Sequence, residues 1–412
     1  MTDAKDEENS CLSITDDVKR ADYYHGLVPR ADIEPLLKKE GDFLLRKTET
    51  NGQTILALSV KWEAQVKHFM INQNERGHFY LETHTEKTVG ELIDWHFRTK
   101  TPCSAASGVR LKRAVERPQW ILTHDSIKMQ KKLGEGAFGE VFTAAFSGDG
   151  ATTLVAVKTM REEMSREARL KFMKEARLMR KLSHRNIVRI LGVAVHEQPL
   201  MIVMELCPGG SLLNYLRKNK GKLTQATKLR FAFEASAGLA YLEQQNFIHR
   251  DIAARNCLLT EKHELKISDF GMSDERKELT DDKLDKVPVK WLAPETMQNK
   301  IYSNKTDVWS FGIMVIKVFK EINFIFLGLG DLCRRSRALS RIVEHSNTCK
   351  DHRSKLSNGN AEGLFSYLFS KLFGFFQDTP TSIAKIVNSC WAKDPADRPS
   401  FQKIHEYIKE KK

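Results

Sequence analysis

Hydrophobic residues near the start of the chain follow two different periods. Four apolar runs, DFLLRKT, TILALSV, KHFMI and HFYLE, have the length and composition of short β-strands. Two other stretches, ADIEPLLKK and VGELIDWHF, carry apolar residues at the spacing of an amphipathic helix. This pattern predicts a small α+β domain over residues 21–117.

A second and larger domain is predicted over residues 127–412. It follows a basic stretch, LKRAVERPQW, and a linker at residues 118–126. Its early part contains a β-branched run, LVAVK, and a long amphipathic pattern, SREARLKFMKEARLMRKL, which predict a strand followed by a helix. Residues 1–20 are polar and acidic, which predicts a disordered tail.

The composition is that of a globular protein, with 41% hydrophobic and 29% charged residues in 412. The net charge of +13 favours acidic partners without choosing among them, and taken alone it is better explained by solubility. The seven cysteines are scattered without metal-ligand spacing, which indicates reduced thiols.

The N-terminus and the longest apolar runs bear on the subcellular location of the protein. The start, MTDAKDEENS, lacks the apolar core of a signal peptide and the glycine needed for myristoylation. The longest apolar runs, at 322–330 and 364–376, are too short or too interrupted to span a bilayer. We expect a cytoplasmic protein with no transmembrane segment, and peripheral membrane association remains open.

A glycine-rich motif, LGEGAFGEV, opens the larger domain. Glycines let backbone amides approach phosphates, although dinucleotide-binding folds share the spacing. The predicted strand that follows ends in Lys158. In the helix after it, Glu175 falls inside the apolar stripe, where a carboxylate is costly unless a cation meets it. Lys158 is the candidate cation, and the pair would hold the ammonium over nucleotide phosphates.

Two further motifs carry the chemistry of phosphoryl transfer. The first is HRDIAARN at residues 249–256, and the second is DFG at residues 269–271. Asp251 is the candidate base for the acceptor hydroxyl, and Asn256 and Asp269 are the candidate Mg²⁺ ligands. The tripeptide APE, which ends at Glu295, and DVWSFG, which begins at Asp307, follow in order.

Taken together, these motifs resemble the eukaryotic protein kinase family. The resemblance implies a bilobal fold, with ATP and Mg²⁺ as cofactors, and a pair between Arg398 and Glu295. It also implies a nucleotide site whose adenine lies between Val141, Ala156 and Leu258, with Met204 as the gatekeeper and the hinge at 205–207. The full predicted set for ATP is Leu133, Gly134, Gly136, Gly139, Val141, Ala156, Lys158, Met204, Glu205, Cys207 and Leu258.

Tyrosine is the acceptor that the catalytic loop favours. Serine-specific kinases typically place a lysine two residues after the catalytic aspartate, and here that position is Ala253. A cation follows instead at Arg255, which can neutralise the transferred phosphate while leaving room for a phenol ring. The segment PVKWLAPE also resembles the tyrosine-kinase form. A serine/threonine or dual-specificity kinase is the alternative.

In the first domain, Arg46 shares a strand face with Leu44, while Phe43 and Leu45 share the other face. A charged arginine on a strand that is apolar on both faces is costly unless it pairs with an anion. Its planar guanidinium can bind phosphate through two hydrogen bonds. The surrounding YYHGLVPRADIEPLL and KHFMI resemble an SH2 domain, a central antiparallel sheet flanked by two helices. The resemblance implies that Arg46 binds phosphotyrosine and that Arg30, Thr48 and His68 complete its pocket.

An SH2 domain directly before a kinase domain, with HGLVPRAD and MELCPGGSL, resembles the Fes/Fer group of non-receptor tyrosine kinases. The implied partners are phosphotyrosine proteins and tyrosine substrates, with no nucleic acid, and the SH2 domain would recruit the kinase to primed substrates or dock on its amino-terminal lobe. The alternative function is an SH2 adaptor with an inactive kinase-shaped scaffold.

Two segments depart from the family pattern. No tyrosine occurs between Asp269 and Glu295, and the position that the family usually phosphorylates falls at Leu279. We therefore expect activity without a loop phosphotyrosine, with Asp281 and Asp282 supplying some negative charge, or control through the SH2 domain.

The second departure lies at residues 320–378, where a phenylalanine-rich and basic stretch replaces the family's shorter substrate-side helix. It is either a family-specific insertion or translated non-coding sequence. In both cases we expect a poorly ordered or weakly docked segment, with ATP binding preserved and peptide-substrate binding weakened.

Overall fold

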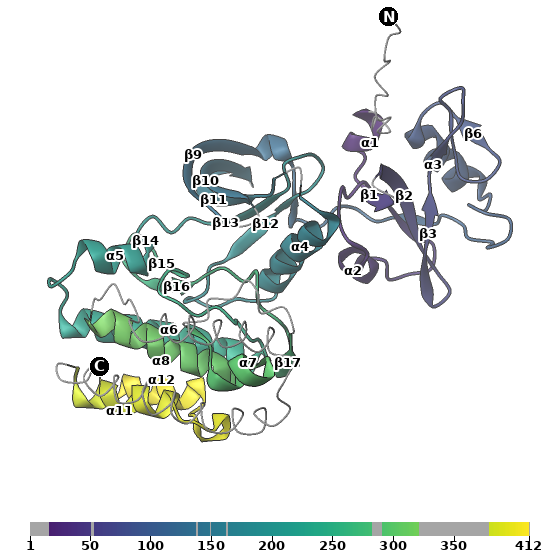
Figure 1. The fold of residues 1–412 in the computed structure, drawn as a ribbon. Coiled ribbons are helices and arrows are strands. Elements are labelled where there is room, and N and C mark those ends of the chain that lie inside the picture. Colours follow the sequence, from purple (N-terminus) through teal and green to yellow (C-terminus); the bar gives the residue numbers. More distant parts are fainter. Residues whose placement is uncertain are drawn as a thin grey trace, which may run out of the picture. The chain divides into compact units, whose positions relative to one another are not determined.

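The computed structural model describes residues 16–50, 53–136, 139–148, 150–161, 164–281, 291–320 and 379–411. The chain divides into two compact units. The first runs through Leu182 and adds Arg189–Leu206, and the second comprises Ser183–Val188 and the chain from Cys207 onward. The first unit therefore holds the predicted SH2 domain together with a second sheet and helix (Figure 1).

The first sheet of this unit has four strands in the order β3-β2-β1-β7. They are β1 (Asp42–Thr50), β2 (Gln53–Trp62), β3 (Gln65–Met70) and β7 (Arg113–Ala114). The β1–β2 and β2–β3 pairs are antiparallel, as predicted, whereas the short β7 lies parallel to β1. A smaller sheet follows with the order β4-β5-β6, made of Asn72–Gln73, Phe79–Tyr80 and Thr85–Glu86. The predicted strand HFYLE is thus only two residues long.

The two faces of the first sheet are buried as the alternation in β1 predicts. Phe43 and Leu45 belong to one apolar cluster, which also holds residues of α3 (Val89–Thr99). Leu44 points to the other face and packs with Ile33 of α2 (Arg30–Ile33). Helix α3 begins with a capping box between Thr88 and Glu91, which satisfies its first backbone N–H groups.

Two expectations for this region need correction. The stretch ADIEPLLKK is not one helix, because α2 ends at Ile33 and only a 3₁₀ turn, η1 (Glu34–Leu36), follows. Pro35 lacks an N–H group and restricts the residue before it, which ends the α-helix. The disordered tail was predicted through Arg20, yet Asp16–Arg20 form α1 and Val18 is buried in the sheet's core. Residues 1–15 lie outside the described residues.

The second sheet has six strands in the order β8-β12-β13-β11-β10-β9. They are β8 (Ile121–Leu122), β9 (Ile127–Glu135), β10 (Glu140–Gly148), β11 (Ala151–Thr159), β12 (Ile190–Ala194) and β13 (Met201–Glu205). Helix α4 (Arg166–Arg180) accompanies this sheet and buries Phe172, Met173 and Ala176. The predicted linker contributes β8, which pairs parallel with β12.

The second unit is mainly helical. Over the described residues its α-helices are α5 (Leu212–Lys218), α6 (Gln225–Gln244), α7 (Pro294–Asn299), α8 (Asn304–Lys320), α11 (Thr381–Cys390) and α12 (Phe401–Lys409). Figure 1 shows α6 and α8 side by side, with α11 and α12 against them. Short strands complete the unit: β14 (Gly210–Ser211), β15 (Cys257–Leu259) and β16 (Leu265–Ile267) form one sheet, and β17 (Glu278–Thr280) pairs with β18 (Ile301–Ser303).

Family-like structure flanks the atypical segment on both sides. Helix α8 runs to Lys320, and a side chain at Gly312 would meet Trp391 at 2.8 Å, so α8 and the chain after α11 are in close contact. Residues 321–378 lie outside the described residues, so the expectations for that segment stay predictions. Over the described residues, no helix combines the length and the apolar character needed to cross a membrane.

Candidate functional site: a phosphate pocket and two halves of a kinase centre

Arg46 lies within β1 and is only 2% exposed. Its Nε donates to Ser59 Oγ at 3.3 Å and its Nη1 to the Lys47 carbonyl at 3.5 Å, while its buried Nη2 has no hydrogen-bond partner in the described structure. Burial, together with repulsion from Arg30, lowers the pKa of Arg46 to about 10, so the side chain remains cationic at neutral pH. A buried cation with an unmet N–H group is suited to bind an anion.

The four residues predicted to bind phosphotyrosine, Arg30, Arg46, Thr48 and His68, line one cavity of about 840 Å³. His68 lies across from Ser59 in the β2–β3 pair, with 2.9 Å between Nδ1 and Oγ. Burial lowers the pKa of His68, and the nearby Arg30 and Arg46 lower it further, which leaves the ring neutral at pH 7. Ser59 was missed by sequence reasoning, although a serine inside the apolar run TILALSV was a signal.

Lys158 and Glu175 form the predicted ion pair. The Lys158 Nζ lies 2.8 Å from both Oε1 and Oε2 of Glu175, whose carboxylate comes from the buried side of α4 and is 3% exposed. The ammonium, at the end of β11, is therefore held by two charge-assisted hydrogen bonds. In the neighbouring strand, Val141 of β10 pairs directly with Lys158.

The glycine-rich motif connects β9 and β10. A Cβ at Gly139 would lie 1.9 Å from the Thr159 carbonyl oxygen, so only glycine fits against β11. A Cβ at Gly134 would meet nothing within 4 Å. The backbone there is accessible on the side where a side chain would stand, as phosphate binding requires. Ala137 and Phe138, at the tip, lie outside the described residues.

The other predicted nucleotide residues divide between the units. In the first unit, Ala156 pairs with Met204 in the β11–β13 ladder, Gly136 closes the β9–β10 turn, and Leu133 is exposed. The Glu205 carboxylate accepts a 2.6 Å hydrogen bond from the Arg189 backbone, which anchors the end of β13. Cys207 and Leu258 belong to the second unit, where Cys207 begins its longer segment and Leu258 lies in β15.

The catalytic loop, in the second unit, gathers polar groups around Asp251. The Asn256 Nδ2 donates to Asp251 Oδ2 at 2.6 Å and to the Asp251 carbonyl at 2.8 Å, and Arg255 is hydrogen-bonded to Oδ1. These bonds fix the orientation of the carboxylate. They also engage the amide nitrogen of Asn256, so its oxygen is the side-chain atom remaining for a cation.

The backbone of this loop is held by Asp307 of α8. Its Oδ2 accepts from the His249 N–H at 2.7 Å and its Oδ1 from the Arg250 N–H at 2.9 Å. His249, also buried, accepts from the Asp251 N–H at Nδ1 and has Nε2 3.1 Å from the Ser268 carbonyl, next to Asp269. The motif DVWSFG alone predicts no role for Asp307, although its place at the start of an apolar helix was a signal.

The chain turns sharply at Asp269, whose φ of +64° lies in the left-handed region. The neighbouring Phe270 is buried, with its ring 5.0 Å from that of His249. A carboxylate at Asp269 and an amide oxygen at Asn256 are hard oxygen donors, the type that Mg²⁺ prefers. The donor set therefore fits the predicted cation.

Glu295 and Arg398 form the pair that the resemblance implied. The Arg398 Nη1 and Nη2 lie 2.6 and 2.9 Å from the two oxygens of Glu295, a bidentate arrangement. Arg398 is 1% exposed, and its Nε donates to the Ala392 carbonyl. Because a lone buried guanidinium is costly, this pair locks α7 to the segment before α12.

Comparison with known proteins decides the family. Residues 127–347 match the protein tyrosine and serine/threonine kinase family, and residues 23–96 match the SH2 domain. Fer-related kinase 1 of Caenorhabditis elegans is 49% identical, over 100% of this chain and 98% of its own length. The chain belongs to the Fer group of SH2-containing protein tyrosine kinases. The resemblance drawn from the motifs is thus confirmed.

Other members of the group are longer than this chain. Human tyrosine-protein kinase Fer is 36% identical over 94% of this chain, but the alignment covers 43% of human Fer. The transforming protein Fps of Fujinami sarcoma virus is 36% identical over 93% of this chain and 40% of its own length. Like these Fer-group proteins, the chain is a tyrosine kinase in which an SH2 domain precedes the kinase domain. Neither the described residues nor the relatives favour the inactive-scaffold alternative.

Proposed function

We propose that this Fer-group kinase transfers the γ-phosphate of Mg-ATP to tyrosine hydroxyls of cytoplasmic protein substrates, using Asp251 as the base. The observation that carries this role is the fixed Asp251 carboxylate, bonded to Asn256 and Arg255. Asp251 would accept the proton of the tyrosine hydroxyl as the phosphate is transferred. Arg255 would stabilise the charge on the transferred group.

Lys158, held by Glu175, would bind nucleotide phosphates, while backbone N–H groups of the 133–141 loop would cradle them. Asn256 and Asp269 would hold Mg²⁺, which neutralises phosphate charge when bound. Val141, Ala156 and Leu258 would enclose the adenine, Met204 would be the gatekeeper, and Glu205 and Cys207 would belong to the hinge.

The kinase assignment is tested with radiolabelled ATP and a tyrosine-containing polymer, followed by phosphoamino-acid analysis. The wild type should label tyrosine, and Asp251→Asn should lose at least about 100-fold in kcat. Label found mainly on serine or threonine would contradict tyrosine specificity. An active Asp251→Asn variant would contradict the assigned base.

We propose as well that the SH2 domain binds phosphotyrosine through Arg46 and recruits the kinase to proteins already phosphorylated. The unmet Nη2 and the shared cavity support this role. Ser59 and His68 would hold the guanidinium in position. No nucleic-acid partner is implied.

The SH2 domain would also act as a brace for α4, because both lie in the first unit and are in contact. Asp32, whose side chain is 2% exposed, lies 3.4 Å from Arg177 and 3.7 Å from Arg180 of α4. The Leu27 N–H donates to the Val195 carbonyl at 2.8 Å, beside β12. Since α4 carries Glu175, this contact would help hold the ion pair with Lys158.

A charge swap tests the brace. Asp32→Arg should lower kcat without changing phosphopeptide affinity, and adding Arg177→Asp should restore part of the loss. The exposed pair of Asp94 and Arg98 on α3 offers a control swap with no expected effect. Unchanged kcat in Asp32→Arg would contradict the bracing role.

A further inference from the structure

The cavity around Arg46 has a second wall, supplied by α4. Its lining includes Arg166, Arg169, Lys171, Lys174 and Arg177 of that helix. At 100° per residue, Arg166, Arg169, Lys174 and Arg177 fall within one side of α4, whereas Lys171 lies outside that side, about 60° beyond Lys174, and still lines the cavity. Glu175 lies on the opposite side, toward Lys158. One helix thus presents cations to the SH2 pocket and a carboxylate to the kinase lysine.

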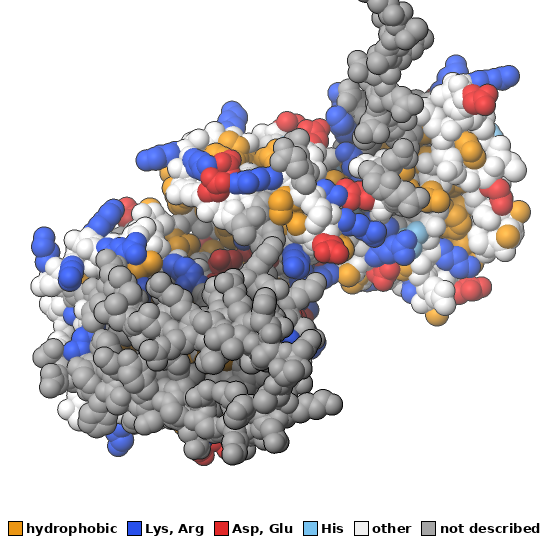
Figure 2. Space-filling view, viewed as in Figure 1, with side chains coloured by type: hydrophobic (Ala, Val, Ile, Leu, Met, Phe, Trp, Pro, Cys, Tyr) orange, Lys and Arg blue, Asp and Glu red, His pale blue; other side chains and the backbone are white. Residues whose placement is uncertain are grey.

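The cations on this wall differ in what they already contact. Arg169 is ion-paired with Glu49, and Arg177 with Asp32. Arg166 and Lys171 are exposed and form no ion pair with any residue that the structure describes. Figure 2 shows Lys and Arg side chains gathered over α2 and beside β3, on the same part of the first unit. The wall therefore carries positive charge beyond what its own carboxylates neutralise.

A single phosphotyrosine does not account for all of this charge. Its phosphate carries about two negative charges, which the buried Arg46 and the neighbouring Arg30 can match. Arg166 and Lys171 belong to the same cavity but lie on α4. They are placed to meet groups that flank the phosphotyrosine.

From this charge we infer that α4 extends the phosphotyrosine pocket and that the preferred ligand carries further negative charge beside its phosphotyrosine. The shared chemistry is an anion on the flanking residues, either Asp and Glu side chains or a second phosphate. The inference rests on the proposed reading of phosphotyrosine by Arg46. It makes Arg166 and Lys171 specificity residues for the ligand.

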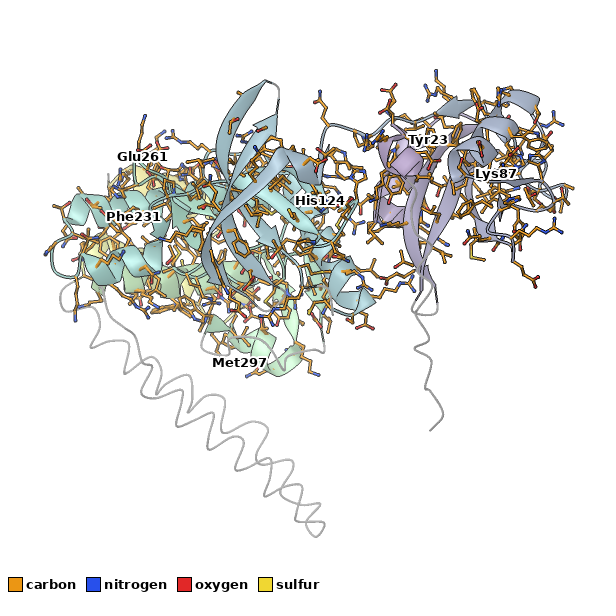
Figure 3. The ribbon with its side chains drawn as sticks, turned by 90° about the horizontal axis from the view of Figure 1, so that it is seen from above. Tyr23, Lys87, His124, Phe231, Glu261 and Met297 are labelled. Carbon is orange, nitrogen blue, oxygen red and sulfur yellow. The ribbon has the colours of Figure 1, made fainter. Side chains whose placement is uncertain are left out.

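The test measures the affinity of the full chain for three labelled peptides by fluorescence anisotropy. All carry one phosphotyrosine; the first has neutral flanks, the second has glutamates on both sides, and the third has a phosphoserine two residues away. The variant is Arg166→Gln with Lys171→Gln, since glutamine keeps helix propensity. The matched control is Arg76→Gln with Lys87→Gln, exposed SH2 residues that do not line the cavity (Figure 3 labels Lys87).

An exposed charge pair typically strengthens binding about two- to five-fold in Kd. With two cations on α4, the wild type should bind at least one acidic peptide about five- to ten-fold tighter than the neutral one. The α4 variant should lose this preference and bind the neutral peptide within about two-fold of wild type. The control should keep the preference, and raising the salt to about 0.5 M should shrink it.

Three results separate the inference from the function on which it rests. Preference that depends on Arg166 and Lys171 supports the inference, and the peptide that shows it identifies the source of the anion. A preference that persists in the α4 variant, or no preference in wild type, overturns it. In a parallel arm, Arg46→Leu should weaken the binding of all three peptides about 100-fold; wild-type affinity in that variant overturns the phosphotyrosine function instead.

Discussion

Arg250 of the catalytic loop is ion-paired with Asp281, with 2.6 Å between Nη2 and Oδ2. The guanidinium, 9% exposed at its side chain, also lies 4.0 Å from the centre of the Tyr302 ring. Asp281 directly follows β17, which pairs with the strand that carries Tyr302. An aspartate of the loop thus contacts an arginine next to Asp251, the proposed base, and an arginine in this position could pair with a phosphate.

We predict that this pair replaces loop phosphorylation in ordering the catalytic loop. A hydrogen bond to a charged group is worth about 1.5 kcal/mol, so Asp281→Asn should lower kcat roughly ten-fold. Asp281→Glu should retain most activity, and Glu278→Gln, an exposed change in β17, serves as the control. Equal kcat in wild type and Asp281→Asn would contradict the role.

The same arrangement predicts activity without any phosphate on the described part of the loop. Leu279, at the position that the family usually phosphorylates, is buried against Ile248 and Tyr302. Mass spectrometry of active enzyme should find no phosphate on Thr280, and Thr280→Ala should keep wild-type activity. Activity that requires phosphorylation of Thr280 would replace this interpretation. Asp282, the other predicted acid, lies outside the described residues.

We predict that the Lys158–Glu175 pair is needed for turnover but not for the SH2 domain. Lys158→Met and Glu175→Gln should each lower kcat by at least about 100-fold, because they remove or release the phosphate-binding ammonium. Phosphopeptide affinity should stay at the wild-type value, which serves as the check on folding. Normal turnover in either variant would remove Lys158 from the proposed mechanism.

Loss of Arg46 should have the opposite profile. Arg46→Leu removes charge-assisted hydrogen bonds to phosphate, and we expect a loss of about 3 kcal/mol, or roughly 100-fold, in phosphopeptide affinity. Calorimetry with phosphorylated and unphosphorylated forms of one peptide measures it. Equal affinity of the wild type for the two forms would contradict phosphotyrosine binding. Met70→Ala, at the exposed rim of the cavity, should cost far less.

The contact between the SH2 domain and β12 should weaken in acid because of His196. Burial lowers the pKa of His196 to about 4, despite a hydrogen bond with the Tyr24 carbonyl, and Arg117 lowers it further. Below the unfolded pKa of about 6.5, the unfolded chain binds a proton that the folded chain excludes. The stabilisation is therefore complete above that value and is lost as pH falls toward 4.

Melting temperatures at several pH values test this. Between about pH 7 and pH 5 the wild type should lose roughly 4–8 °C more than His196→Gln, equivalent to about 2 kcal/mol. His78→Gln, a change in the loop between β4 and β5, is the matched control. A wild type and a His196→Gln variant with parallel pH profiles would show that His196 does not titrate in this way.

Much of the candidate kinase site could be predicted from the sequence because its residues lie in short local motifs. Lys158, Asp251, Asn256 and Asp269 sit in short patterns whose chemistry requires those residue types, and Glu175 was found from its place in an apolar helical stripe. Arg398 and Glu295 are far apart in the chain, and their pairing came from the family resemblance. It is confirmed in the structure.

Local motifs did not predict the roles of Ser59 and Asp307 or the ends of several helices and strands. Whether a serine in a strand supports Arg46 depends on the register between β1, β2 and β3, which no local pattern fixes. Pro35 was a local signal for the end of α2, but the apolar spacing of ADIEPLLKK predicted one longer helix.

The sequence by itself determined the fold class and the Fer-group family and supplied the residues proposed for phosphoryl transfer, because these depend on motifs within a few positions of one another. Only the tertiary structure decided which long-range partners those residues meet. It brought Asp281 to Arg250, and it brought the cations of α4 to the pocket of Arg46. Such pairings depend on packing between elements far apart in the chain, which sequence spacing alone does not encode.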